Sequence, residues 1–230
     1  MIQKHVVAIV QARMGSHRLP GKTMMKIQDQ PLLYHVIQQV QKAYHVNMIV
    51  VATSTGAQDD CIAEYALQLG VQVYRGDEDD VLSRFYEAAV WYHADVIVRI
   101  TADCPLLDPR LIDAGIEILF IDDIDFVSNV DPPSFPDGMD VEIMTFACLE
   151  QAQKQAVLPM DREHVTSFIK QHPSLFKTKN YPCTHGDLSS YKLSVDTHAE
   201  LELIRNMYPY LPKDFGYMDI ISHYWRGWCV

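Results

Sequence analysis

Four short apolar segments alternate with helical patterns in the first hundred residues, and this alternation limits the chain to one class of fold. The apolar segments are residues 6–10, 48–52, 71–74 and 96–100, and such runs are typical of strands that are buried on both faces. Apolar residues at helical spacing fill residues 31–44, 59–69 and 80–92. The repeated order of strand, helix and strand predicts an α/β protein with a mostly parallel sheet between two helical layers, a three-layer α/β/α arrangement.

The second half has a less regular pattern. It predicts helices over residues 111–120, 146–156, 164–171 and 198–207, and strands over 126–130, 141–144 and 191–195. A loop with three prolines, residues 131–138, is too short to be a domain linker, and the apolar pattern resumes directly after it. We therefore expect one domain over residues 1–230, long enough to bury a full core.

The charge balance and the cysteines exclude several classes of protein. The chain has 30 acidic and 19 basic residues, which argues against a general nucleic-acid binder. No apolar stretch approaches the roughly 20 residues of a membrane span, and the first residues lack a signal-peptide pattern; we expect a cytoplasmic protein without a membrane partner. Free thiols are expected because the cysteines share no metal-binding spacing; they are Cys61, Cys104, Cys148, Cys183 and Cys229.

A basic loop follows the first predicted strand of this acidic chain. Residues 11–22 contain Arg13, Arg18 and Lys22, two glycines, Ser16 and no acidic residue. Glycine lets backbone N–H groups approach phosphate oxygens, and the cationic side chains neutralise them. The loop lies at the carboxyl end of a strand, where α/β proteins bind ligands, so it predicts a polyphosphate site rather than an ordinary surface loop.

Two aspartates are candidate metal ligands near these phosphates. Asp103 follows the fourth predicted strand, and Asp196 ends a later apolar run. Mg²⁺ prefers one or two carboxylates together with phosphate oxygens. The alternatives are that Asp103 stabilises a turn and that Asp196 is a helix N-cap. Among the other strand ends, Arg75 could reach a phosphate or ribose, whereas Asp79 or Asp80 would cap the next helix.

Charged loops in the second half are candidates for binding a second substrate. They span residues 137–142 and 161–164. For Glu163 and His164, the alternative is a place near a helix N-terminus without a role in binding.

The motifs together resemble a known family. I-V-Q-A-R-M-G-S-H-R-L-P-G-K (residues 9–22) resembles the signature of cytidylyltransferases that activate acidic sugars, such as the CMP-ketodeoxyoctonate and CMP-acylneuraminate synthetases. The most similar branch is the spore-coat polysaccharide synthesis F-type proteins. Further motifs in the same order are V-R-I-T-A-D-C-P-L-L-D (98–108), P-D-G-M-D-V-E (136–142), D-R-E-H-V-T (161–166) and V-D-T (195–197), and the resemblance spans residues 5–205.

The resemblance implies a nucleotide-diphospho-sugar transferase-like fold, CTP as substrate, Mg²⁺ as cofactor and a homodimer. Residues 1–110 would bind the nucleotide, and residues 111–230 would bind the acceptor and form the dimer. Four residues would be catalytic, namely Arg13, Arg18, Lys22 and Asp103. The nucleotide would contact these four and also Gln11, Ala12, Gly15, Ser16, Thr53, Arg75 and Thr101. The metal would lie on Asp103 and Asp196. The acidic sugar would lie near Asp137, Asp140, Glu142, Arg162, Glu163 and His164.

The expected reaction is transfer of CMP from CTP to an acidic sugar with release of pyrophosphate, for surface polysaccharide or glycan biosynthesis. Thr101 stands where better-studied synthetases carry Gln, which helps to read the base. This leaves open another nucleotide, a phosphorylated small-molecule acceptor or a sugar transferase of the same fold. A non-catalytic binding subunit would have lost the basic loop or the two aspartates, and both are present.

Overall fold

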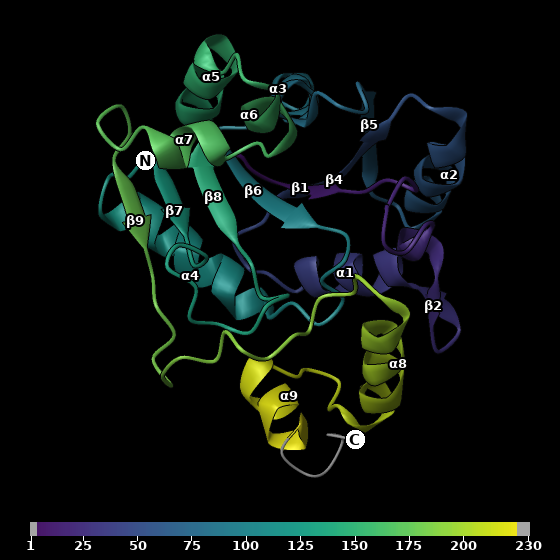
Figure 1. The fold of residues 1–230 in the computed structure, drawn as a ribbon. Coiled ribbons are helices and arrows are strands. Elements are labelled where there is room, and N and C mark those ends of the chain that lie inside the picture. The colour runs from purple at the N-terminus through teal and green to yellow at the C-terminus, as the bar shows by residue number, and fades with distance from the viewer. Residues whose placement is uncertain (1–3, 225–230) are drawn as a thin grey trace.

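The computed structural model describes residues 4–224 and is built on a seven-stranded sheet in the order β5-β4-β1-β6-β8-β7-β9 (Figure 1). Four parallel strands come from the first half: β1 (Val6–Gln11), β4 (Met48–Ser54), β5 (Gln72–Gly76) and β6 (Val96–Thr101). All four predicted strands are confirmed. Each extends slightly further toward its carboxyl end than predicted, so the residues after the apolar runs still belong to the sheet.

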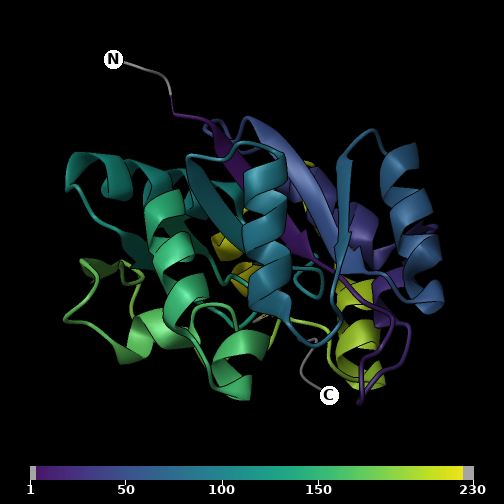
Figure 2. The same ribbon diagram turned by 90° about the horizontal axis from the view of Figure 1, so that it is seen from above.

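The connecting helices pack on both faces of the sheet, as predicted. They are α1 (Leu32–Val40), α2 (Asp60–Gln68) and α3 (Val81–Trp91). Alternate residues of β1 enter two separate cores: Ala8 and Val10 pack with α1 and α2, whereas Val7 and Ile9 pack with α3. Figures 1 and 2 show the resulting layers, with the sheet between the two groups of helices.

The second half adds three strands and most of the remaining helices. Five of its elements match predictions: α4 (Pro109–Ile121), β7 (Phe126–Ser128), β8 (Glu142–Thr145), α5 (Phe146–Gln155) and α8 (His198–Met207). β8 lies antiparallel between β6 and β7, so the sheet changes direction beside β6. The edge strand β9 (Thr178–Asn180) pairs parallel to β7. It was not predicted because its three polar residues carry no apolar pattern.

One predicted helix is shorter than expected, and one predicted strand is wrong. The helix expected over residues 164–171 begins three residues later, as α7 (Ser167–Gln171), and a separate short helix, α6 (Pro159–Glu163), precedes it; Val165, between the two, has a positive φ of 42°. Residues 191–195 do not form a strand. Leu193 and Val195 are fully buried, which explains their apolar alternation, but only Lys192 forms an isolated bridge, to Asp137.

Several short elements had no clear sequence signal. They are the 3-10 helices η1 (Lys22–Met24), η2 (Ala57–Asp59) and η3 (Tyr208–Tyr210), the hairpin strands β2 (Lys26–Ile27) and β3 (Gln30–Pro31), and the helix α9 (Tyr217–Tyr224). Within residues 4–224, no helix is long and apolar enough to cross a membrane.

Four cysteines are free, as expected: Cys61 is exposed, and Cys104, Cys148 and Cys183 are buried. Cys229 lies outside the described residues. No group of three or more His, Cys, Asp or Glu side chains is arranged to hold a metal ion in the part of the chain that the structure describes.

Candidate active site

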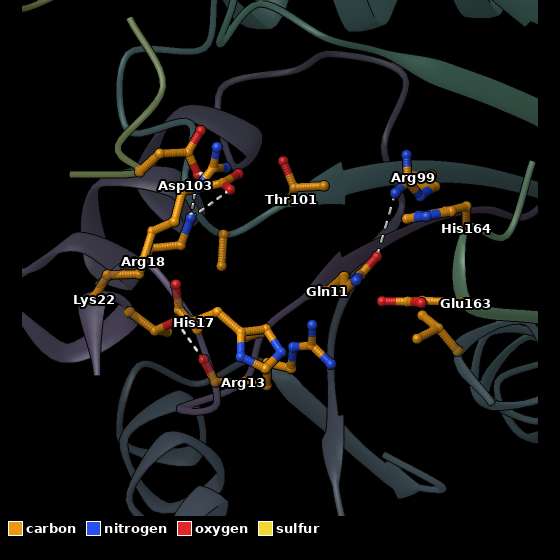
Figure 3. Close-up of a pocket in the computed structure, with 16 residues that line it drawn as sticks. Gln11, Arg13, His17, Arg18, Lys22, Arg99, Thr101, Asp103, Glu163 and His164 are labelled. Atoms are coloured by element: carbon orange, nitrogen blue, oxygen red, sulfur yellow. Dashed lines mark hydrogen bonds and ion pairs between the residues drawn. The ribbon is translucent and has the colours of Figure 1, made fainter. Parts of the chain in front are cut away.

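A cavity of about 360 Å³ lies at the carboxyl ends of β1 and β6 (Figure 3). The structure brings most of the predicted site residues to its wall. These are Gln11, Ala12, Arg13, Ser16, Arg18, Lys22, Thr101, Asp103, Glu163, His164 and Asp196. Segments that are up to 185 residues apart in the sequence therefore meet in one crevice, at the place where parallel sheets bind ligands.

The basic loop after β1 is fastened to its neighbours at several points. The backbone N–H of Met14 donates to Asp59 Oδ1 at 2.7 Å, and the other oxygen of Asp59 accepts from the hydroxyl of Ser54 at 2.6 Å. Asp59 is fully buried. Gly21 adopts a left-handed φ of 74°, which glycine tolerates without strain, and its N–H donates to Met14 O. The loop thus has a fixed shape before any ligand binds.

Lys22 lies between the two predicted metal ligands. Its Nζ is 2.8 Å from Asp103 Oδ2, 3.0 Å from Asp196 Oδ1 and 2.8 Å from the carbonyl oxygen of Val195. Burial opposes its charge, but the two carboxylates outweigh burial and raise the pKa of Lys22. The ammonium is therefore held firmly by three oxygens.

The two aspartates are ionised because cations surround them. Asp196 contacts Arg18 at 2.8 Å and Lys192 at 2.9 Å in addition to Lys22. Burial acts against ionisation, yet these cations lower the pKa of Asp196 to about 2. Lys22 likewise overcomes the burial of Asp103 and holds the pKa of that carboxyl below its usual range.

The structure contradicts the alternative for Asp196. The N-cap of α8 is Thr197, which forms a capping box with Glu200, so Asp196 is free to point at Lys22. The carboxylate of Asp103 contacts both Lys22 and the thiol of Cys104 in its own turn, so it does more than stabilise that turn.

The donor set at this end of the cavity fits a Mg²⁺ ion bound together with a nucleotide. Two ionised carboxylates converge on one point, which the Lys22 ammonium occupies. Magnesium is typically held by one or two carboxylates plus phosphate oxygens. The ammonium would have to move aside toward the phosphates for both carboxylates to bind the ion.

The opposite end of the cavity has different chemistry. Figure 3 shows Gln11, Arg99, Glu163 and His164 grouped there, away from Lys22 and Asp103, with Thr101 between the two groups. Glu163 is the last residue of α6 and His164 its C-cap, and both precede the N-terminus of α7, whose N-cap is Thr166. Both line the cavity.

Three predicted nucleotide contacts do not line this cavity. The prediction for Thr53 is wrong, because β4 continues through Ser54 and the side chain of Thr53 is fully buried. Arg75 donates to the carbonyl oxygens of Ser54 and Gly56 and pairs with Asp60 at 2.7 Å, so it closes the turn after β4. Gly15 is also outside the cavity wall.

The capping prediction for the acids after β5 is confirmed, since Asp80 Oδ1 accepts from the backbone N–H of Ser83 at the start of α3. The other oxygen of Asp80 accepts from Arg162. Arg162 therefore ties α6 to the N-terminus of α3, and it also lines a neighbouring cavity with Arg13 and His17.

Two of the predicted acceptor residues, Asp137 and Glu142, are held in ion pairs. Asp137 pairs with Lys192 at 2.7 Å and accepts from Ser194. Glu142 is almost completely enclosed; its carboxylate pairs with Arg99 and Lys170 and accepts from the hydroxyl of Thr166. These partners occupy both of its oxygens, and its contact with the acceptor stays a prediction.

Sequence reasoning missed three cations, namely Arg99, Lys170 and Lys192. Arg99 carried a usable signal, because it is the only charged residue in its apolar strand. Lys192 neutralises both Asp137 and Asp196. Only the folded chain reveals that it does so.

Known proteins that are similar to this chain match the segments that form the cavity. A sequence model of the cytidylyltransferase family matches residues 7–214. The spore coat polysaccharide biosynthesis protein SpsF of Bacillus subtilis is 32% identical over 209 residues, which are 88% of this chain and 86% of that protein. A 3-deoxy-manno-octulosonate cytidylyltransferase of Trichlorobacter lovleyi is 36% identical over 114 residues, 49% of this chain and 44% of that protein. The solved structure of a cytidylyltransferase from Leptospira borgpetersenii matches with a TM-score of 0.91 and 35% identity, over 95% of this chain and 93% of that chain.

Proposed function

This chain belongs to the cytidylyltransferase family, and on that premise we propose that it transfers CMP from CTP to an acidic sugar and releases pyrophosphate. Membership makes it a nucleotidyltransferase enzyme. The sugar class is inferred from the relatives, because one is a 3-deoxy-manno-octulosonate cytidylyltransferase and another is named for polysaccharide biosynthesis. Synthesis of a surface polysaccharide or glycan is the process that we propose the product serves.

The observation that carries this proposal is the charge arrangement around Lys22. Lys22 and Arg18 meet Asp103 and Asp196 at one end of the cavity. Cations alone would suit any anion, and carboxylates alone would suit a cation. The two together suit a triphosphate that binds with a divalent ion.

The residues present can assist phosphoryl chemistry without forming a covalent intermediate. An acceptor oxygen attacks the α-phosphorus in line, and the bond to the β-phosphate breaks. Lys22, Arg18 and Arg13 would hold the triphosphate and stabilise the charge on the departing pyrophosphate. Mg²⁺ bound to Asp103 and Asp196 would supply further charge neutralisation. The fixed loop after β1 would contribute by orienting the phosphates.

The other end of the cavity would receive the acceptor, beside His164 and Glu163. The base would lie near Gln11 and Thr101. Thr101 is shorter than the glutamine that better-studied synthetases carry at this position, so the choice of nucleotide requires a direct test. Thermal shifts with CTP, UTP, GTP, ATP and dTTP in the presence of Mg²⁺ should show the largest stabilisation with CTP. A larger shift with another nucleotide would replace CTP in the proposal.

The decisive experiment measures pyrophosphate release from CTP and Mg²⁺ with 3-deoxy-manno-octulosonate or an acylneuraminate as acceptor. We expect Asp103→Asn to abolish release. Asp123→Asn is the matched control, since Asp123 pairs with Lys177 on the exposed surface and its loss should leave the rate unchanged. Activity near wild type in Asp103→Asn would contradict the proposed site. Light scattering would test the homodimer that we propose from the same resemblance.

A further inference from the structure

A second, smaller cavity opens beside the first. It has a volume of about 120 Å³ and shares two wall residues, Arg99 and Thr101, with the main cavity. The rest of its wall is formed by Val130, Asp140, Glu142 and Lys170. Because the two cavities share Arg99 and Thr101, the small cavity adjoins the main one between the end that holds Lys22 and the end that holds His164 (Figure 3).

Asp140 differs from four other carboxylates around this crevice, although Glu163 on the main cavity wall likewise has no ion-pair partner among the described residues. Asp103, Asp137, Glu142 and Asp196 each form at least one ion pair. Among the residues that the structure describes, none forms an ion pair or hydrogen bond with the carboxylate of Asp140, although it faces the small cavity. A carboxylate without a partner beside a binding site is available to a substrate.

The surroundings of Asp140 make it a stronger base than an ordinary carboxylate. Asp140 is exposed on the cavity wall; the loss of hydration where surrounding protein crowds its carboxyl, followed by the negative charges of Asp137 and Glu142, raises the pKa of Asp140 to about 6. Arg99 acts in the opposite direction, and Asp103 adds a weaker repulsion. Such a group is ionised at neutral pH and still has a useful affinity for a proton, as general base catalysis requires.

Two groups beside the small cavity, Glu142 and Cys104, cannot take the same role, whereas Glu163 and His164 lie on the wall of the main cavity. Glu142 is enclosed by Arg99, Lys170 and Thr166. The thiol of Cys104 is buried, and burial, followed by the negative charges of Asp103 and Asp140, raises its pKa.

We propose that Asp140 is the general base of the reaction. This inference rests on the proposed function. The acceptor lies beside His164 and Glu163 and extends its hydroxyl into the adjoining small cavity, against the carboxylate of Asp140. As its oxygen forms the bond to the α-phosphorus, the hydroxyl proton moves to a carboxylate oxygen of Asp140. The bond between the α-phosphorus and the bridging oxygen breaks, and pyrophosphate leaves with that electron pair.

The test compares Asp140→Asn with wild type in pyrophosphate release from CTP, Mg²⁺ and 3-deoxy-manno-octulosonate. Loss of a general base typically lowers the rate by about 10²- to 10⁴-fold, and we expect a kcat loss in that range. Asp140→Glu should recover part of it. The wild-type kcat should rise with pH through about 6. This rise of kcat with pH, the acid limb of the pH profile, should vanish in Asp140→Asn. It should persist in Glu163→Gln, whatever the effect of Glu163→Gln on the rate.

A stability measurement separates this role from a structural one. A raised folded-state pKa means that the stabilising contribution of Asp140 is present at low pH and is lost as the pH rises through about 6. Asp140→Asn should therefore have an equal or higher Tm than wild type above this pH, with an unchanged thermal shift by CTP. A lower Tm together with weakened CTP binding would indicate a structural residue.

Retention of kcat or of the acid limb in Asp140→Asn, with an active wild type, would overturn the base assignment and leave the proposed function standing. If the wild type released no pyrophosphate with any acidic acceptor, both would be overturned.

Discussion

Replacement of Lys22 by methionine tests the charge arrangement on which the active site depends. The change removes the ammonium that contacts Asp103, Asp196 and Val195 O. The two aspartates are affected differently. Asp196 keeps Arg18 and Lys192 as partners, whereas Asp103 loses the one cation that contacts it among the described residues.

The loss of stability should therefore come mainly from Asp103. Removing one partner of a fully buried ion pair costs about 3–5 kcal/mol. The side chain of Asp103 is 26% exposed, so water recovers part of its solvation, and we expect a loss of about 3 kcal/mol at neutral pH. Without Lys22, burial governs Asp103 and favours its protonated form. The loss should consequently shrink as the pH falls and this carboxyl is protonated.

Urea denaturation followed by circular dichroism would measure this loss. Lys177→Met is the matched control, because Lys177 forms an exposed pair with Asp123 and its loss should leave the unfolding free energy almost unchanged. Mg²⁺ alone should stabilise Lys22→Met more than wild type, since the ion no longer competes with the ammonium. A loss equal to that of the control, or no difference in the response to Mg²⁺, would refute the reasoning.

Three further substitutions test single features of the structure. Gly138 has a φ of +104°, and an added Cβ would lie 2.7 Å from the backbone of residues 193–194; Gly138→Ala should lower the unfolding free energy by about 2 kcal/mol or more, and an unchanged urea midpoint would contradict this. Thr53→Val removes a buried hydroxyl that has no hydrogen-bond partner within residues 4–224, so stability should rise by about 1 kcal/mol with unchanged CTP binding in a thermal-shift assay. Arg162→Met should cost about 1 kcal/mol in thermal or urea unfolding by freeing Asp80, and Arg162→Lys should recover part of that loss.

The fold was predictable where the apolar pattern of a segment corresponds to the burial of its residues within a helix or strand. β1 and β4 are buried on both faces, which produces continuous apolar runs that are typical of buried strands. Residues 191–195 show the opposite case, because Leu193 and Val195 are buried without an adjacent strand to pair with. β9 is short and polar, and the neighbouring β7 determines its conformation.

The candidate site was predictable where one segment carries its whole chemistry. Arg18 and Lys22 lie in one basic loop with glycines, so their grouping is visible in the sequence. The prediction for Thr53 was wrong because successive strand residues face opposite sides of the sheet, and the end of β4 was misplaced by two residues. The enclosure of Glu142 depends on Arg99 and Lys170 from two other elements. No local pattern encodes it.

The buried contact between Asp59 and the loop after β1 has a consequence for how fast and how tightly a nucleotide binds. Asp59 holds Met14 N–H and Ser54 at once, so the loop loses its conformational entropy during folding rather than during ligand capture. Weakening this contact, as in Asp59→Asn, would substitute none of the cations that face the phosphates. It would nevertheless populate loop conformations that cannot bind the nucleotide. Nucleotide affinity would then fall in proportion to the competent fraction of molecules. A residue that the nucleotide never contacts would in this way set the affinity of the site.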